Sequence, residues 1–221
     1  MAETETRIEL AIPSPQKLFT PVVTVILVLM VIGYALTIYA KNFTTTYLAL
    51  SATGVFSGKI WQLVTYPFID GNMLILIFHL FLVLFVGSNI EREWRSKELI
   101  LFWLIVSTIC GLIWVVVCQL IGTNYLGWSA AACGFGLISA FGLLFRRKKF
   151  IAWFWVMQAQ HAAWGLIVIG IIFSIPQPIT FIWLTGALSG YFYVKLRRRM
   201  LYRAGTAPQE TYRPQSFVDI D

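Results

Sequence analysis

The chain has 221 residues, of which 58% are hydrophobic and only 12% are charged. A soluble domain cannot hide that much apolar surface from water, so the composition excludes a soluble protein and indicates a polytopic membrane protein. The net charge of +7 gives no reason to expect a nucleic-acid partner, because Lys and Arg stand beside the apolar runs and not in a separate basic domain. All three cysteines lie inside apolar runs, which supports neither a disulfide framework nor a metal site, and no cofactor is expected.

Six apolar runs are long enough to cross a bilayer, and they form one membrane domain over 19–200 between polar tails at 1–18 and 201–221. They lie at about Pro21–Ala40, Met73–Ile90, Leu99–Gly122, Gly127–Phe145, Phe150–Ile175 and Ile179–Leu196. The expected fold is therefore an all-α bundle of six transmembrane helices. The links after the second, fourth and sixth runs hold nearly all the Lys and Arg, which predicts that both termini and both tails are cytoplasmic.

The link between the first and second runs, about Lys41–Asn72, is unusually long. It has few charges and many aromatic residues, including Tyr47, Trp61 and Phe68. A solvated linker would be more polar, and Trp and Tyr are favoured at the membrane interface. We therefore expect this first loop to be embedded in the interface.

A stretch of small residues, Tyr125–Gly136, opens the fourth run and carries a single hydroxyl, that of Ser129. Ser129 is either a buried nucleophile or a packing hydroxyl that bonds back to the preceding turn. His79, inside the second run, is either a base for Ser129 or a neutral imidazole satisfied by a neighbouring hydroxyl or carbonyl. Asp70, near the start of that run, either orients a polar loop or water, or is an acid favoured by a helix N-terminus.

Four motifs in chain order resemble those of the rhomboid intramembrane serine proteases, over about Phe19–Lys195. They are Gly58–Tyr66 in the first loop, Glu91–Trp94 in the link, Gly127-Trp128-Ser129 opening the fourth run, and Gly186 with Gly190 in the sixth. The resemblance implies a six-helix rhomboid-like bundle with Ser129 at the nucleophile position. The glycine spacing lets the sixth helix press against the fourth. The chain departs from the family at the dyad His, which is Trp183, and at three further polar positions, which are Asp70, Ile75 and His79.

These departures bear on activity. The indole of Trp183 has no acceptor lone pair and cannot take the proton of Ser129. Loss of the base costs several orders of magnitude in serine enzymes, and loss of an oxyanion donor, here at Ile75, costs about 10²–10³. The sequence therefore predicts a pseudoprotease that binds transmembrane segments of client proteins in the lipid bilayer. The alternative is an active serine endopeptidase in which His79 replaces the missing base. The overall pattern looks closest to bacterial members of that family, which implies a bacterial plasma membrane.

Overall fold

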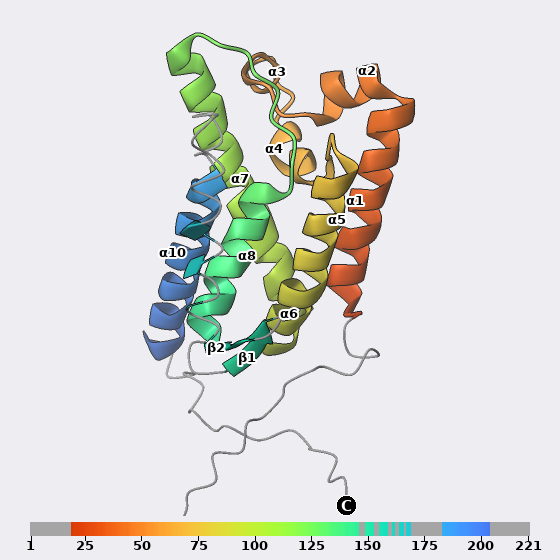
Figure 1. Cartoon of the computed structure of the whole chain (residues 1–221). Helices are drawn as coiled ribbons and strands as arrows, with labels where there is room; N and C mark the ends of the chain where they lie inside the picture. The colour runs from red at the N-terminus through yellow and green to blue at the C-terminus, as the bar shows by residue number, and fades with distance from the viewer. Residues whose placement is uncertain are drawn as a thin grey trace, which may run out of the picture.

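The computed structural model describes residues 19–145, 149–152, 155–158, 161, 164–165, 167–168 and 183–203. The predicted tails therefore lie outside the described residues, except for 201–203. As predicted, the described part is predominantly helical (Figure 1). The exception is an antiparallel hairpin in which β1 (Lys149–Ala152) pairs with β2 (Trp155–Gln158).

The hairpin stands where the sequence predicts the start of a fifth membrane helix at Phe150, so that prediction is wrong over these residues. The physical reason is the local composition of 150–156, in which large aromatic and β-branched side chains favour the extended backbone. Most of the rest of the predicted fifth run, up to Ile175, lies outside the described residues.

Three helical runs in the described residues are long and apolar enough to span a membrane. They are α1 (Pro21–Tyr39), the run Met73–Trp94, and α7 (Ser96–Ile121), with 19, 22 and 26 residues. The second run joins α5 (Met73–Leu82), the π-helical η4 (Val83–Gly87) and α6 (Ser88–Trp94). By contrast, α8 (Ala131–Leu144) has 14 residues, which is shorter than the hydrocarbon layer requires. The protein is thus a multi-helix membrane protein, although the described residues do not establish six crossings.

The ends of these helices follow from local chemistry. Pro21 opens α1, where its missing N–H has no helical partner to lose. Asn72 caps α5 by accepting a hydrogen bond from the N–H of Leu74 at 2.8 Å. Gly122, with φ 71°, ends α7 in the left-handed conformation that glycine adopts without strain.

The long first loop folds into short helical segments. These are α2 (Lys41–Phe43), the π-helical η2 (Thr44–Leu48), α3 (Ala52–Phe56), α4 (Gln62–Thr65) and the 3₁₀ turn η3 (Tyr66–Phe68). Two of them, α3 and α4, pack against α7. The apolar side chains of this loop form a cluster with Val115 and Cys118 of α7. One side of the loop is therefore held against α7, while its other side is exposed, with Phe56 at 68% and Trp61 at 47%. The embedding of the loop in the membrane interface stays a prediction.

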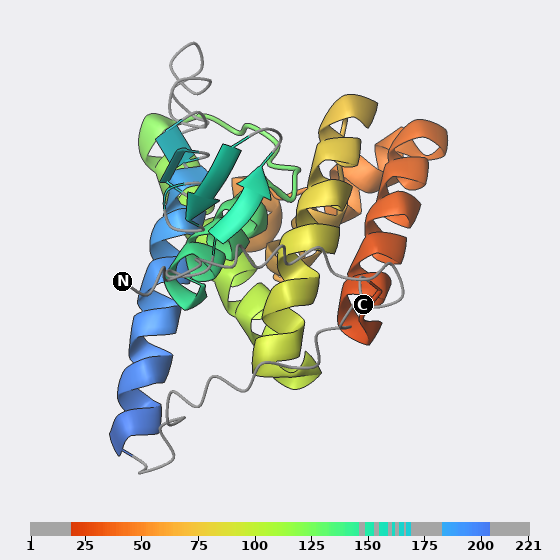
Figure 2. The ribbon, with the colours of Figure 1, turned by 60° about the horizontal axis from the view of Figure 1, so that its bottom comes forward.

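The last described helix, α10 (Trp183–Arg203), lies along one edge of the bundle and α1 along the opposite edge (Figures 1 and 2). α10 packs against α8 with almost no side-chain layer between them. A Cβ built on Gly186 would lie 1.9 Å from the carbonyl oxygen of Ala132, and one on Gly190 would lie 2.4 Å from that of Gly136. The close approach that the spacing of Gly186 and Gly190 predicts is therefore observed.

Candidate functional site

Two irregular segments meet in the upper part of the bundle, above the start of α8. Leu50 of the first loop and Gly127 exchange both backbone hydrogen bonds at 2.8 Å, in an isolated antiparallel bridge. The N–H of Ser129 also donates to the carbonyl oxygen of Tyr66 at 3.3 Å. In Figure 1 the segment between α7 and α8 descends along these loop helices before α8 begins. Non-helical backbone at membrane depth persists only where protein satisfies its polar groups, and these bonds do so.

Ser129 lies outside the helix that the sequence places it in. α8 begins at Ala131 and not at Gly127, because Gly127 is tied to Leu50 and Ser129 has φ 147°, which no helix accommodates. The hydroxyl oxygen of Ser129 accepts a hydrogen bond from the N–H of Ala131 at 3.1 Å. The hydroxyl thus stabilises the start of α8 and does not bond back to a preceding turn. A residue other than glycine at this φ is strained.

The structure brings together two residues that the sequence treats separately. Asp70 and His79 form a buried pair, with Oδ2 of Asp70 3.1 Å from Nδ1 of His79 and side chains 1% and 5% exposed. Because Asn72 caps α5, Asp70 is not the acid of a helix N-terminus but the partner of the imidazole. An Nδ1–H group can donate to this carboxylate, and a neutral imidazole with its proton on Nδ1 has its lone pair on Nε2.

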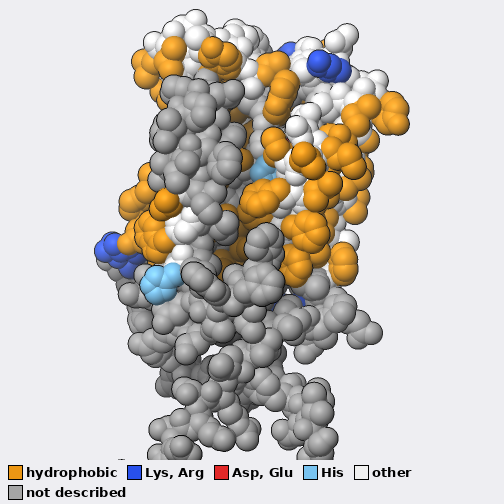
Figure 3. Space-filling view, viewed as in Figure 1, with side chains coloured by type: hydrophobic (Ala, Val, Ile, Leu, Met, Phe, Trp, Pro, Cys, Tyr) orange, Lys and Arg blue, Asp and Glu red, His pale blue; other side chains and the backbone are white. Residues whose placement is uncertain are grey.

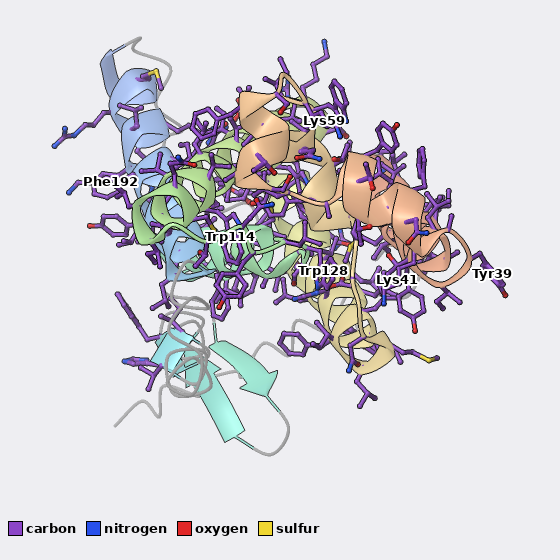
Figure 4. All side chains as sticks on the ribbon, turned by 90° about the horizontal axis from the view of Figure 1, so that it is seen from above. Tyr39, Lys41, Lys59, Trp114, Trp128 and Phe192 are labelled. Carbon is purple, nitrogen blue, oxygen red and sulfur yellow. The ribbon has the colours of Figure 1, made fainter. Side chains whose placement is uncertain are left out.

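The remaining positions of the predicted site do not all converge. None of the hydrogen bonds among the described residues joins His79 to Ser129. The side chain of Ile75 is 47% exposed on α5, so it faces outward. Trp183 begins α10, but its side chain lies outside the described part of the structure. Trp128 is 37% exposed, and its indole Nε1 would lie 3.3 Å from a Cβ built on Gly71; Figure 4 shows it near the middle of the molecule seen from above.

Gln62 is a second buried polar residue, and the sequence alone did not single it out as a centre of the loop. Its side-chain oxygen accepts from both the N–H and the hydroxyl of Ser51, at 3.2 and 3.3 Å, and its amide nitrogen donates to the carbonyl oxygen of Thr46 at 3.2 Å. Gln62 is completely buried, and its bonds tie three parts of the loop together. In the sequence, Gln62 is an uncharged amide among apolar residues. This pattern indicates that the side chain is buried, but it does not say which groups it bonds to.

These residues define what the polar region can do. Across the described residues, no group of three or more His, Cys, Asp or Glu side chains is placed to hold a metal ion. The Asp70–His79 pair supplies an oriented imidazole. Ser129 supplies a hydroxyl on a strained backbone, and this hydroxyl already accepts a hydrogen bond from the N–H of Ala131. The described contacts do not assemble them into one relay.

A second feature is an apolar groove between α1 and α5. Its volume is about 520 Å³, and it is lined by Leu27, Val28, Val31, Ile32, Ile77, Leu80, Phe81 and Leu84. Figure 3 shows hydrophobic side chains gathered over this face of the molecule. Several lining residues are about half exposed, among them Val28 at 51% and Phe81 at 57%. The groove therefore opens to the surroundings.

Comparison with known proteins corrects two expectations. The model of a family described as eukaryotic integral membrane protein (DUF1751) matches residues 22–200. None of the curated proteins matches the chain. The predicted rhomboid membership is wrong, because the family that matches is DUF1751. The spacing of Gly186 and Gly190 was not specific evidence, because small residues at this interval let helices pack closely in many membrane proteins. The bacterial plasma membrane is likewise contradicted by the eukaryotic family. The chain belongs to the DUF1751 family of eukaryotic integral membrane proteins.

Proposed function

We propose that this integral membrane protein binds transmembrane segments of client proteins in the groove between α1 and α5, without acting on them chemically. The observation that carries the proposal is the groove itself, which has almost no polar lining and stays open between two membrane-spanning helices. In lipid, helices associate through close packing and not through the hydrophobic effect. An open groove offers a client helix contact surface that a flat helix face lacks.

The spacing of the lining residues suits a helical ligand. Val28, Val31 and Ile32 recur at intervals of three and four on α1, and Ile77, Leu80, Phe81 and Leu84 do so on α5 and η4. Side chains at these intervals form ridges along one face of a helix, and a third helix packs its own ridge between two such rows. The ridge on α5 and η4 runs for about 10 Å, or roughly two helical turns.

Filling the groove is expected to weaken client binding. The Val28→Trp/Ile77→Trp double variant places two large rings between the helices, and we expect about a ten-fold loss of affinity, as for truncation or blockage of a central contact. Binding can be measured by energy transfer in phosphatidylcholine vesicles, from a dye on the protein to one on a synthetic Leu/Ala transmembrane peptide with Lys at both ends.

The matched control is Leu112→Trp/Val116→Trp on α7, where the two side chains are 46% and 52% exposed and are not among the residues that line the α1–α5 groove. This variant should bind the peptide as the parent protein does. Equal affinity for all three proteins, or equal loss in both double variants, would remove the groove as the client site.

A second candidate function, a serine endopeptidase with Ser129 as nucleophile and His79 as base, is favoured by one observation. The Asp70 carboxylate holds Nδ1 of His79, as an orienting acid holds the base of a serine enzyme. Against it, the Ser129 hydroxyl already accepts from Ala131, and no described contact links it to His79.

A serine-reactive phosphonate probe separates the two candidates. We expect no labelling of the folded protein, because an unactivated serine hydroxyl is a poor nucleophile. Labelling that disappears in Ser129→Ala and falls strongly in both His79→Ala and Asp70→Asn would establish the enzyme and displace the binding proposal.

A further inference from the structure

α10 carries an apolar stripe along most of its length. Its members recur every four residues and are each 56–62% exposed: Leu188, Phe192, Leu196 and Met200. Residues four apart share one face of a helix, so these side chains form a continuous line along the outer side of α10. Figure 4 shows Phe192 at the edge of the molecule. In a membrane-spanning bundle, such a face contacts lipid acyl chains.

Cations border the lower part of this stripe. Lys195 and Arg199 directly precede Leu196 and Met200, and both are exposed. One residue corresponds to about 100° around a helix, so each cation flanks the stripe without covering it. Lys and Arg side chains beside lipid-facing residues extend their charged ends to the level of the headgroups. This segment of α10 therefore passes from acyl chains to headgroups.

Within the described residues, most of this charge has no acidic partner. Arg197 forms an ion pair with Glu98 of α7 and lies 5.1 Å from the centre of the Trp94 ring, which fixes α10 to the α6–α7 turn. Arg198 donates to the carbonyl oxygen of Leu143, at the end of α8, at 3.0 Å. Of the ion pairs in the described part of the chain, none includes Lys195, Arg198 or Arg199.

We infer that this end of α10 binds an anionic phospholipid, with the acyl chains along the stripe and the headgroup at Lys195, Arg198 and Arg199. Apolar and cationic side chains share one surface, and a phospholipid with net negative charge complements both parts. A soluble anion would leave the stripe unused, and a zwitterionic lipid would leave the charge uncompensated.

Arg95, at the same end of the molecule, offers an independent test. It stands between α6 and α7 with φ 73° and ψ 158°, a backbone region that is nearly restricted to glycine, and its side chain is exposed. Arg95→Gly should therefore raise the melting temperature while removing one cation from the headgroup level. If Arg95 had only a structural role, a more stable variant would bind lipid as well as the parent protein. A higher melting temperature together with a lower lipid affinity therefore indicates that the cation itself contacts the lipid.

The test is native mass spectrometry of the full-length protein in detergent, titrated with dioleoylphosphatidylserine and, separately, dioleoylphosphatidylcholine. We expect Lys195→Gln/Arg199→Gln to bind phosphatidylserine about 30-fold more weakly, or roughly five-fold per cation. Arg95→Gly should bind it a few-fold more weakly. Phosphatidylcholine binding should be unchanged in every variant.

The matched control is Lys41→Gln/Lys59→Gln, which removes the same charge at the opposite end, where Lys59 donates to the carbonyl oxygen of Thr46. Unchanged phosphatidylserine affinity in this control, with loss in the α10 variant, supports the site. Equal loss in both double variants, no loss in the α10 variant, or displacement of the lipid by excess inorganic phosphate would overturn it. Melting curves of each variant show whether the fold is intact.

Discussion

Replacing Gly186 with alanine is expected to destabilise the protein by about 3 kcal/mol, at the upper end of the range for overpacking. The added Cβ would lie 1.9 Å from the backbone oxygen of Ala132, and a backbone atom cannot rotate away as a flexible side chain can. α10 would have to move off α8, with loss of the packing along their shared length. Thermal unfolding in detergent, followed by circular dichroism, should show the largest fall in melting temperature of any single Gly→Ala change on this interface.

Gly134→Ala on α8 is the matched control, because its Cβ would meet the side chain of Leu82 at 3.5 Å, which is an ordinary van der Waals contact. Alanine also favours the helix by about 1 kcal/mol over glycine, so this variant should be at least as stable as the parent. A Gly186→Ala protein that melts with the parent would show that α8 and α10 are not in the contact described.

Replacing Glu91 with alanine is expected to lower the free energy of unfolding by about 3 kcal/mol, as for loss of several hydrogen bonds to a buried charged group. Its carboxylate accepts from the N–H groups of Val22 and Val23, at 3.1 and 3.0 Å, and from the hydroxyls of Thr20 and Ser96. It therefore closes the N-terminus of α1 with a negative charge, where the helix dipole favours one.

Glu93→Ala, two residues away and exposed, removes the same charge without touching α1, and should change the melting temperature by less than a few degrees. The melting temperature of Glu91→Gln should lie between those of Glu91→Ala and Glu93→Ala, because glutamine keeps an acceptor oxygen but loses the charge. Equal melting temperatures for the Glu91→Ala and Glu93→Ala proteins would contradict the capping role. Protease cleavage near residue 20 should rise only when Glu91 is changed.

Features set by nearby residues were predictable from the sequence. The apolar runs at Pro21–Tyr39 and Ser96–Ile121 were located because twenty apolar residues in a row have few alternatives to a membrane helix. The contact of Gly186 and Gly190 with α8 followed from their four-residue spacing, which clears one face of a helix. The same glycine spacing misled the family assignment, because small residues at this interval allow close helix packing in unrelated membrane proteins.

The polar contacts were decided only by the tertiary structure. The partner of His79 is Asp70, the cap of α1 is Glu91, and the start of α8 moves to Ala131 because Gly127 pairs with Leu50. Each of these joins a helix to a loop or to a distant turn, and no local periodicity encodes such a meeting. A buried polar group needs a partner, so the sequence by itself indicated that His79, inside an apolar run, would be bonded, but it did not predict the burial of Glu91. Which groups they meet depends on how segments distant in sequence, such as Glu91 and Val22 or Leu50 and Gly127, come together, and that is a property of the packed fold.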